Sequence, residues 1–277
     1  CNARKVSRKF EKVVDRLKSK YDGIAINISK QEVYLNIEND SICYKKEENG
    51  SFVQCEFDED YGIDVNIELS APLAVLTNSK SFINCFWIAT YDHETTIIMP
   101  KLIESLSKEV CPLFYAKRVE LMAQHDDYVI QLLSLFQSGV LEQLCLSETG
   151  LDDDTFAKLV EMDQFKQLKS IAYAVFEPIP LSQFNRFSHL ITFKGFVDIV
   201  SAEDIVILRD ILSQFANLES AEISWMDSLI LSEIGKALGI EYDNSEQITY
   251  RHPFSNSDKL FVMEIKDDTI SVTTENN

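Results

Sequence analysis

The chain has 277 residues, 45 % hydrophobic and 26 % charged, which is the composition of a globular protein and not of a disordered one. The net charge of −19 argues against binding of nucleic acid by the main body, because affinity for phosphate backbones comes largely from Lys and Arg. Only eight glycines and six prolines are present, too few for a flexible linker protein or a loop-rich catalytic surface.

Residues 3–20 are predicted to form an amphipathic helix, in which Val6, Phe10 and Val13 recur at helical spacing. Residues 1–20 hold eight basic and two acidic side chains, a net charge of +6, and the remaining residues carry −25. We interpret the basic face as solvated, with contact to phosphates or acidic lipid as the alternative. Because the first residue is Cys and not Met, we expect residues upstream to be missing, and we recognise no signal peptide.

The pattern then changes to the alternation of half-buried strands. Five such segments are predicted, at 24–28, 33–37, 42–44, 52–57 and 63–67. Asn39-Asp40 and Glu48-Asn49-Gly50 supply turns between them. We expect residues 21–70 to form an antiparallel strand region.

From about residue 71 onward, short strands alternate with helices. The predicted helices cover residues 71–79, 97–109, 126–137, 152–166, 179–186, 201–215 and 227–238. The predicted strands between them are Cys85–Ile88, Arg118–Leu121, Gln143–Leu146, Ser170–Tyr173, Leu190–Phe193 and Ala221–Ile223. The chain is expected to end in strands at 247–251, 260–265 and 269–272.

An apolar residue precedes several of these strands at a fixed offset. The shared template is Leu141-x-x-Leu144-x-Leu146, Leu168-x-x-Ile171-x-Tyr173, Leu218-x-x-Ala221-x-Ile223 and, more loosely, Ala116-x-x-Val119-x-Leu121. A spacing in the twenties with this template is typical of stacked leucine-rich-repeat-like units, although no Asn or Cys follows at the usual ladder position. The predicted fold class is α/β: an antiparallel β-meander, then irregular leucine-rich-repeat-like strand–helix units, then a C-terminal β segment.

The six cysteines show no C-x-x-C spacing and are too sparse for a disulfide framework. We expect reduced thiols, with Cys43, Cys85 and Cys145 as small core residues. This indicates an intracellular location in the cytoplasm, with the nucleus as a further compartment. No apolar run reaches the roughly 18 residues needed to cross a bilayer, so we expect no membrane association.

Motifs for catalysis are absent from the sequence. It contains no P-loop, no G-x-G-x-x-G, no G-x-S-x-G and no H-E-x-x-H, and each of the four histidines stands alone in its segment. We therefore predict no enzyme activity, cofactor or metal site. A nucleophile pair such as Cys111 with His125 is the alternative, since catalytic partners can lie far apart in sequence.

Two acidic clusters are interpreted without a metal. Asp58-Glu59-Asp60 lacks the alternating spacing of a calcium loop. Asp152-Asp153-Asp154 precedes an apolar-periodic helix, where carboxylates cap free amides. Both tryptophans, Trp87 and Trp225, are expected to be buried between strand and helix, with an exposed interface anchor as the alternative for one of them.

Four segments, in this order, resemble the nematode F-box-associated FTH domain. They are Val160–Lys169, Phe184–Leu190, Glu203–Leu212 and Tyr250–Ser257. Phe165 stands where the family usually has Trp, and Arg186 where it has His. The resemblance implies an FTH-like strand–helix domain over residues 71–277.

Residues 1–15 look like the last helix of an F-box, so residues 1–20 are expected to be the C-terminal helix of a truncated F-box. The resemblance implies a substrate-recognition subunit of a cullin-type ubiquitin ligase. Val6, Phe10 and Val13 would contact a Skp-type adaptor, which links to a cullin, and the FTH-like domain would hold an unknown target protein. The alternative is a ubiquitin-independent scaffold or inhibitor that binds a partner protein.

Overall fold

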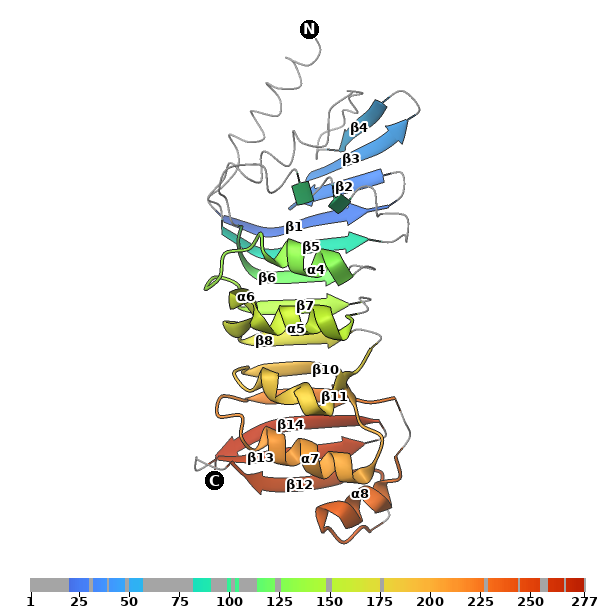
Figure 1. Cartoon of the computed structure of the whole chain (residues 1–277), viewed down its shortest axis with the longest axis vertical. Coiled ribbons are helices and arrows are strands. Elements are labelled where there is room, and N and C mark those ends of the chain that lie inside the picture. The colour runs from blue at the N-terminus through green and yellow to red at the C-terminus, as the bar shows by residue number, and fades with distance from the viewer. Residues whose placement is uncertain are drawn as a thin grey trace. The chain divides into compact units, whose positions relative to one another are not determined.

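The computed structural model describes most of the chain as a mixed α/β protein (Figure 1). The described residues are 20–29, 32–38, 40–47, 50–56, 82–90, 99–100, 103–104, 114–122, 126–147, 151–174, 177–226, 229–243, 245–254, 259–266 and 268–276. The predicted helices at 3–20 and 71–79 and the strand at 63–67 lie outside these residues, apart from Lys20. The chain divides into two compact units, the first made of Cys1–Glu142 and Asp152–Gln164, the second of Gln143–Leu151 and Phe165–Asn277.

The first unit contains an antiparallel ribbon joined to parallel strands. β1 (Lys20–Ile28), β2 (Glu32–Ile37), β3 (Asp40–Glu47) and β4 (Gly50–Glu56) pair antiparallel in sequence order. β5 (Phe82–Thr90) and β6 (Tyr115–Met122) pair parallel, and β5 also lies parallel to β1. The antiparallel pairing expected for the first four strands is confirmed; the parallel pairing of β1 with β5 was not predicted.

The helices of the first unit begin where the sequence indicated. α4 (Asp126–Leu133) and α5 (Asp153–Glu161) contact each other, and Met99, Pro100, Ile103 and Glu104 are helical. The side chain of Asp152 caps α5, since its Oδ1 accepts a hydrogen bond from the amide of Thr155 at 2.7 Å. This hydrogen bond lowers the pKa of Asp152. The capping role predicted for this acidic cluster is confirmed.

The second unit contains parallel strands followed by antiparallel ones. β7 (Gln143–Ser147), β8 (Ser170–Ala174), β10 (Thr192–Asp198) and β11 (Ser220–Ser224) are parallel in this order. β14 (Thr269–Asn276) then pairs antiparallel with β11, β13 (Lys259–Lys266) with β14, and β12 (Ile248–Pro253) with β13. The short β9 (Ile179–Pro180) pairs with β10. The expected C-terminal β segment is confirmed.

α7 (Ala202–Leu212), drawn in front of the strands in Figure 1, contacts α8 (Leu231–Leu238) and the 3₁₀ helix η2 (Leu181–Phe187). Ser201 and Asp204 form a capping box at the start of α7: Ser201 Oγ accepts from the amide of Asp204, and Asp204 Oδ2 accepts from the amide of Ser201. Gly239 ends α8 with a φ of 73°, a conformation that glycine adopts without strain.

α4 and α8 are shorter than the helices predicted at 126–137 and 227–238, and two other predicted helices differ more. The helix expected at 152–166 breaks at Met162, whose backbone is extended, and α6 (Asp163–Lys166) follows it. The helix expected at 179–186 is instead η2. Leu181, Phe184 and Phe187 are spaced by three residues, and a 3₁₀ helix with three residues per turn brings such residues onto one side.

The parallel strands bury side chains at equivalent positions, and these positions lie opposite one another on neighbouring strands. In the second unit Leu144, Ile171, Phe193 and Ala221 pair across neighbouring strands, and so do Leu146, Tyr173, Gly195 and Ile223. All the apolar residues of the four sequence templates are buried. The same spacing also occurs, buried and in register, in Tyr21-x-x-Ile24-x-Ile26, Ile83-x-x-Phe86-x-Ile88 and Leu190-x-x-Phe193-x-Gly195.

Two further expectations are corrected. The strand expected at Leu190–Phe193 is β10, which begins at Thr192 and continues to Asp198. Cys43, Cys85 and Cys145 are thiols outside any disulfide, but they are only half-buried and not core residues. Strand alternation explains this for Cys145, because Leu144 and Leu146 on either side face the core.

Candidate functional site

Along β1, β2, β7, β8, β10 and β11, one set of side chains is buried and the alternating set is half-buried or exposed, and the same holds around Trp87 in β5. We call the side that carries this second set the open face. Side chains on this face point away from the core residues of the same strands.

Trp87 lies on the open face of the first unit. Its neighbours Phe86 and Ile88 are fully buried, and alternation along β5 places Trp87 on the opposite side, where it is half-buried. Trp225, by contrast, is buried, with 1 % of its surface exposed. The expected burial is therefore confirmed for Trp225 and wrong for Trp87.

A hollow of about 520 Å³ lies beside Trp87. Strands β1, β2 and β5 and the turn after β2 line it, with Asp22, Gly23, Ile24, Ala25, Asn36, Glu38, Cys85 and Trp87. The parallel pairing of β1 with β5 sets Gly23 opposite Cys85 and Ala25 opposite Trp87, although more than 60 residues separate them along the chain. The small residues Gly23 and Ala25 thus leave space beside the large ring of Trp87.

Hydrogen bonds position the acidic groups at this hollow. Asn84 Nδ2 donates to Asp22 Oδ1 at 2.9 Å. The amide of Glu38 donates to the carbonyl of Gly23 at 3.2 Å, so the turn after β2 is tied to β1. Among the described lining residues there is neither Lys nor Arg. The lining therefore carries two carboxylates and an aromatic ring.

Glu120 lies opposite Trp87 on β6 and forms an ion pair. Arg118 Nε approaches Glu120 Oε1 to 2.7 Å, and the Cys85 thiol donates to the same oxygen at 3.6 Å. The charge of Glu120 is therefore balanced by Arg118. Tyr34 extends the open face along β2, and its hydroxyl donates to Glu32 Oε2 at 2.6 Å. This hydrogen bond raises the pKa of Tyr34.

The open face of the second unit is rich in small polar side chains. In register across β7, β8, β10, β11 and β14 lie Gln143, Ser170, Thr192, Ser220 and Thr273. Thr192 Oγ1 donates to Ser170 Oγ, and Lys194 forms an ion pair of 2.8 Å with Glu222. Such a surface offers hydroxyl groups and single charges, as the polar rim of a protein interface does.

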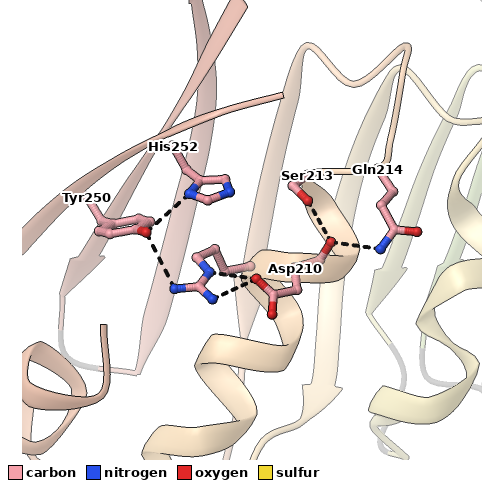
Figure 2. Close-up of polar contacts among 6 residues, drawn as sticks. Asp210, Ser213, Gln214, Tyr250 and His252 are labelled. Atoms are coloured by element: carbon pink, nitrogen blue, oxygen red, sulfur yellow. Dashed lines mark hydrogen bonds and ion pairs between the residues drawn. The ribbon is translucent and has the colours of Figure 1, made fainter. Parts of the chain in front are cut away.

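A second polar cluster joins α7 to β12 (Figure 2). Arg209 contacts Asp210 Oδ1 through Nε at 2.8 Å and Nη2 at 2.7 Å, and its Nη1 donates to Tyr250 Oη at 3.4 Å. Tyr250 and His252 stack, and Tyr250 Oη lies 3.2 Å from His252 Nδ1 (Figure 2). The cation of Arg209 also lies 5.7 Å from the centre of the Tyr250 ring. These contacts fasten the end of α7 to an edge strand.

This cluster makes the stability of the second unit depend on pH. Burial, together with the charge of Arg209, lowers the pKa of His252, while Asp210 opposes the shift. The unfolded chain therefore binds the proton more readily, and stability falls as pH drops below about 6.5, the unperturbed value. His252→Gln is expected to flatten this part of the profile, as measured by urea unfolding between about pH 7.5 and about pH 5. An equally steep decline in the variant would contradict the assignment.

The other histidines, Cys111 and the predicted adaptor contacts remain to be placed. His189 Nε2 lies 3.0 Å from the carbonyl oxygen of Phe165, and its ring contacts the Phe165 ring edge to face. Cys111, His93 and His125 lie outside the described residues, as do Val6, Phe10 and Val13. Among the described residues, no group of His, Cys, Asp and Glu could hold a metal ion. None of the helices described in the structure is long and apolar enough to cross a membrane.

No direct sign of the hollow is visible in the sequence, because its residues come from distant segments. Two signals could have indicated it. A glycine within a strand, as at Gly23, often marks a place where something approaches closely. The alternation Phe86-Trp87-Ile88 places the indole on the side opposite its two apolar neighbours.

Comparisons with known proteins place the chain in a family. Neither the curated proteins nor the solved structures yielded a match. The family model described as FTH domain matches residues 97–241, more than half of the chain. Three of the four segments that resemble this family lie inside the matched range, and Tyr250–Ser257 lies beyond it. The chain therefore belongs to the FTH domain family.

Proposed function

We propose that this chain is a protein-recognition module that holds a target protein for a cullin-type ubiquitin ligase. The observation that carries the proposal is the family match, because FTH domains are associated with F-box proteins. The open faces support it, since they carry a half-buried tryptophan, hydroxyl groups and single charges. Trp is enriched among the residues that carry most of the binding energy in protein interfaces, and polar side chains form the rim of such interfaces.

In this proposal the N-terminal residues contribute the end of an F-box. Val6, Phe10 and Val13 contact a Skp-type adaptor, which links the chain to a cullin, and the bond-forming chemistry belongs to other subunits. In this proposal the chain is not an enzyme and needs no cofactor. It acts inside the cell and binds neither nucleic acid nor membrane. The nematode origin implied by the resemblance is part of the same proposal.

The in-register parallel strands support a further detail. We infer that they behave as leucine-rich-repeat-like units, each of which buries its apolar residues against its neighbours. A stack of this kind holds its strands rigidly and presents their alternating side chains to a partner. The acidic body favours approach by basic partners.

Affinity capture of the full-length protein tests the proposal. We expect a Skp-type adaptor and a cullin among the captured proteins, together with a target that accumulates when the proteasome is inhibited. The triple variant Val6→Asp, Phe10→Asp, Val13→Asp should lose the adaptor and cullin but keep the target. Arg8→Ser with Lys12→Ser is the matched control, since both residues lie on the charged side of the same predicted helix. This variant should retain the adaptor.

Two outcomes would contradict the ligase proposal. Capture without any adaptor or cullin removes the link to ubiquitin transfer. A captured target whose level does not respond to proteasome inhibition would favour the ubiquitin-independent scaffold or inhibitor instead.

A further inference from the structure

We propose that an exposed apolar patch of the second unit binds a basic, amphipathic segment of the target protein. The patch consists of Val200, Met226 and Ile230, and we call it the edge patch. This inference rests on the proposed function, because it names the surface on which the module would hold its target. The exposure of the three side chains, the local packing that they lack and the charge around them carry it.

The residues of the edge patch follow two neighbouring strands. β10 and β11 lie parallel with Phe196 opposite Ser224, so both strands end at the same edge of the sheet. Val200 comes two residues after the end of β10, and Met226 comes two residues after the end of β11. Ile230 directly precedes α8, which contacts α7 (Figure 1). The edge at which the parallel strands end therefore carries three apolar side chains from separate segments.

These side chains leave most of their surface in water. Val200 is 62 % exposed, Met226 72 % and Ile230 59 %, and they are the three most exposed large apolar residues in the described part of the chain. Single apolar residues on a surface are ordinary, but several at one place mark a contact site for another molecule. Methionine is common at such sites, because its flexible side chain adapts to different partners.

Packing against α7 does not account for Val200. It stands directly before Ser201, the N-cap of α7, where an apolar residue commonly packs on the fourth residue of the helix. That residue is Ile205, which is fully buried, whereas Val200 remains largely exposed. Val200 is therefore left uncovered at a position where the helix itself could have covered it.

Ile230 occupies a position at which a polar residue would stabilise the helix. It is the N-cap of α8, and its side chain makes no capping hydrogen bond. Asp152 and Ser201, by contrast, cap α5 and α7 with their side chains. Ser, Thr, Asp and Asn are strongly preferred at N-caps, and isoleucine is among the least favoured residues there. An exposed isoleucine at this position thus costs helix stability, and contact with a partner explains its presence.

The segments that form the edge patch are acidic. Residues 198–204 and 225–233 contain no Lys or Arg and five acidic residues, which are Asp198, Glu203, Asp204, Asp227 and Glu233. The turn at 266–268, Lys-Asp-Asp, lies beside them, since the Trp225 amide donates to the Asp268 carbonyl at 3.2 Å. Asp204 also serves the capping box of α7, whereas Asp198 and Asp268 lie outside any helix. The surroundings of the patch therefore carry a net negative charge.

This charge selects one occupant among three that could cover an apolar patch. A membrane surface with acidic lipids would be repelled. A second copy of the chain would bring like charges together. A partner segment with Lys or Arg beside its apolar side chains would be attracted, and the net charge of −25 over residues 21–277 favours its approach. An amphipathic helix presents both kinds of group at once, with apolar residues on one face and basic residues beside them.

The methyl signals of the five methionines allow a direct NMR test in the whole chain. Met226→Leu identifies the signal of Met226. The probe is a synthetic peptide of about twelve residues with Leu at positions i, i+3, i+4 and i+7 and Lys elsewhere. It should shift the Met226 signal and leave those of Met99 and Met263 in place, since both are fully buried. Peptides with Glu in place of Lys, or with Ser in place of Leu, should cause no shift.

A change at Ile230 separates binding from folding. Ile230→Ser supplies the missing N-cap, so this variant should unfold at a higher temperature. It should also bind the Lys–Leu peptide about tenfold more weakly, because an apolar contact is lost. Ile230→Leu is the matched control, which keeps the apolar surface and should keep the affinity.

The charge is tested separately. Asp198→Asn combined with Asp268→Asn should weaken peptide binding and make the affinity less sensitive to salt. Glu219→Gln is the control, since Glu219 is an exposed acid directly before β11, at the opposite edge of the sheet. This variant should bind the peptide as the wild type does.

Several results would overturn the inference. They are an equal shift with the Glu peptide, full affinity in Ile230→Ser, or no shift of the Met226 signal by the Lys–Leu peptide. A Met226 signal that responds to phosphatidylserine vesicles, or that shifts as the chain dimerises with rising concentration, would assign the patch to another occupant. Unimpaired capture of adaptor and target by full-length Ile230→Ser would contradict this inference alone. Peptide binding at the patch of a chain that captures no adaptor would instead count against the ligase proposal.

Discussion

Replacement of Phe184 by alanine is expected to lower the free energy of unfolding of the second unit by about 3–5 kcal/mol. The Phe184 ring is fully buried. Its centre lies 5.0 Å from that of Phe193 and 5.7 Å from that of Phe215, which it stacks. Alanine would leave a cavity between η2, β10 and the segment after α7, and rigid neighbouring rings cannot close such a cavity fully.

Urea unfolding followed by the fluorescence of Trp225 measures this loss. Trp225 is a reporter of the second unit, and Trp87→Phe removes the signal of the first. Asn185→Ala is the control, since Asn185 is an exposed residue of the same 3₁₀ helix. That change should stay within about 0.5 kcal/mol of the wild type. A loss below about 1 kcal/mol in Phe184→Ala would show that Phe184 does not organise this core.

Gly195→Ala is expected to destabilise the second unit by about 1–3 kcal/mol, although it adds a single carbon atom. The added Cβ would lie 2.7 Å from the carbonyl oxygen of Tyr173 and 2.9 Å from its Cβ. It would also lie 3.2 Å from Cζ of Phe193. Gly195 pairs with Tyr173 on one side and Ile223 on the other, so β10 can relieve the clash only by moving against two strands at once.

Gly23→Ala provides a matched control for this prediction. Gly23 also lies within a parallel strand, yet a Cβ there meets nothing closer than 4.0 Å. We expect the stability of this variant to be unchanged or to rise by up to about 1 kcal/mol. Equal urea midpoints for Gly195→Ala and the wild type would contradict the close packing of Tyr173 over Gly195.

The sequence predicted the strands well wherever both apolar positions carry bulky side chains. Leu144 with Leu146 and Ile171 with Tyr173 define their strands and the face that each buries. β10 was placed too early, because glycine occupies the third template position at Gly195 and interrupts the apolar pattern.

Helix types were harder to predict. A three-residue spacing fits both helical periods over a short segment, so η2 was expected to be an α-helix.

The candidate site was predicted only in its parts. Trp87 was recognised as a possible anchor, but its partners were not, because β1 and β5 are joined by a connection that contains three other strands. No local pattern records which strands pair over such a distance. The conformation of Glu38 was equally hidden, since glutamate is not a residue that indicates a positive φ.

The connection between β1 and β5 has a consequence for how relatives of this protein can diverge. It contains the whole ribbon from β2 to β4, yet Tyr21, Ile24 and Ile26 still meet Ile83, Phe86 and Ile88 in register. Nearest-neighbour stacking requires only that each strand match the two beside it. Segments between strands are thus free to lengthen, shorten or acquire new elements over evolutionary time. Paralogues can therefore differ in the residues around the hollow while every buried strand keeps its neighbours.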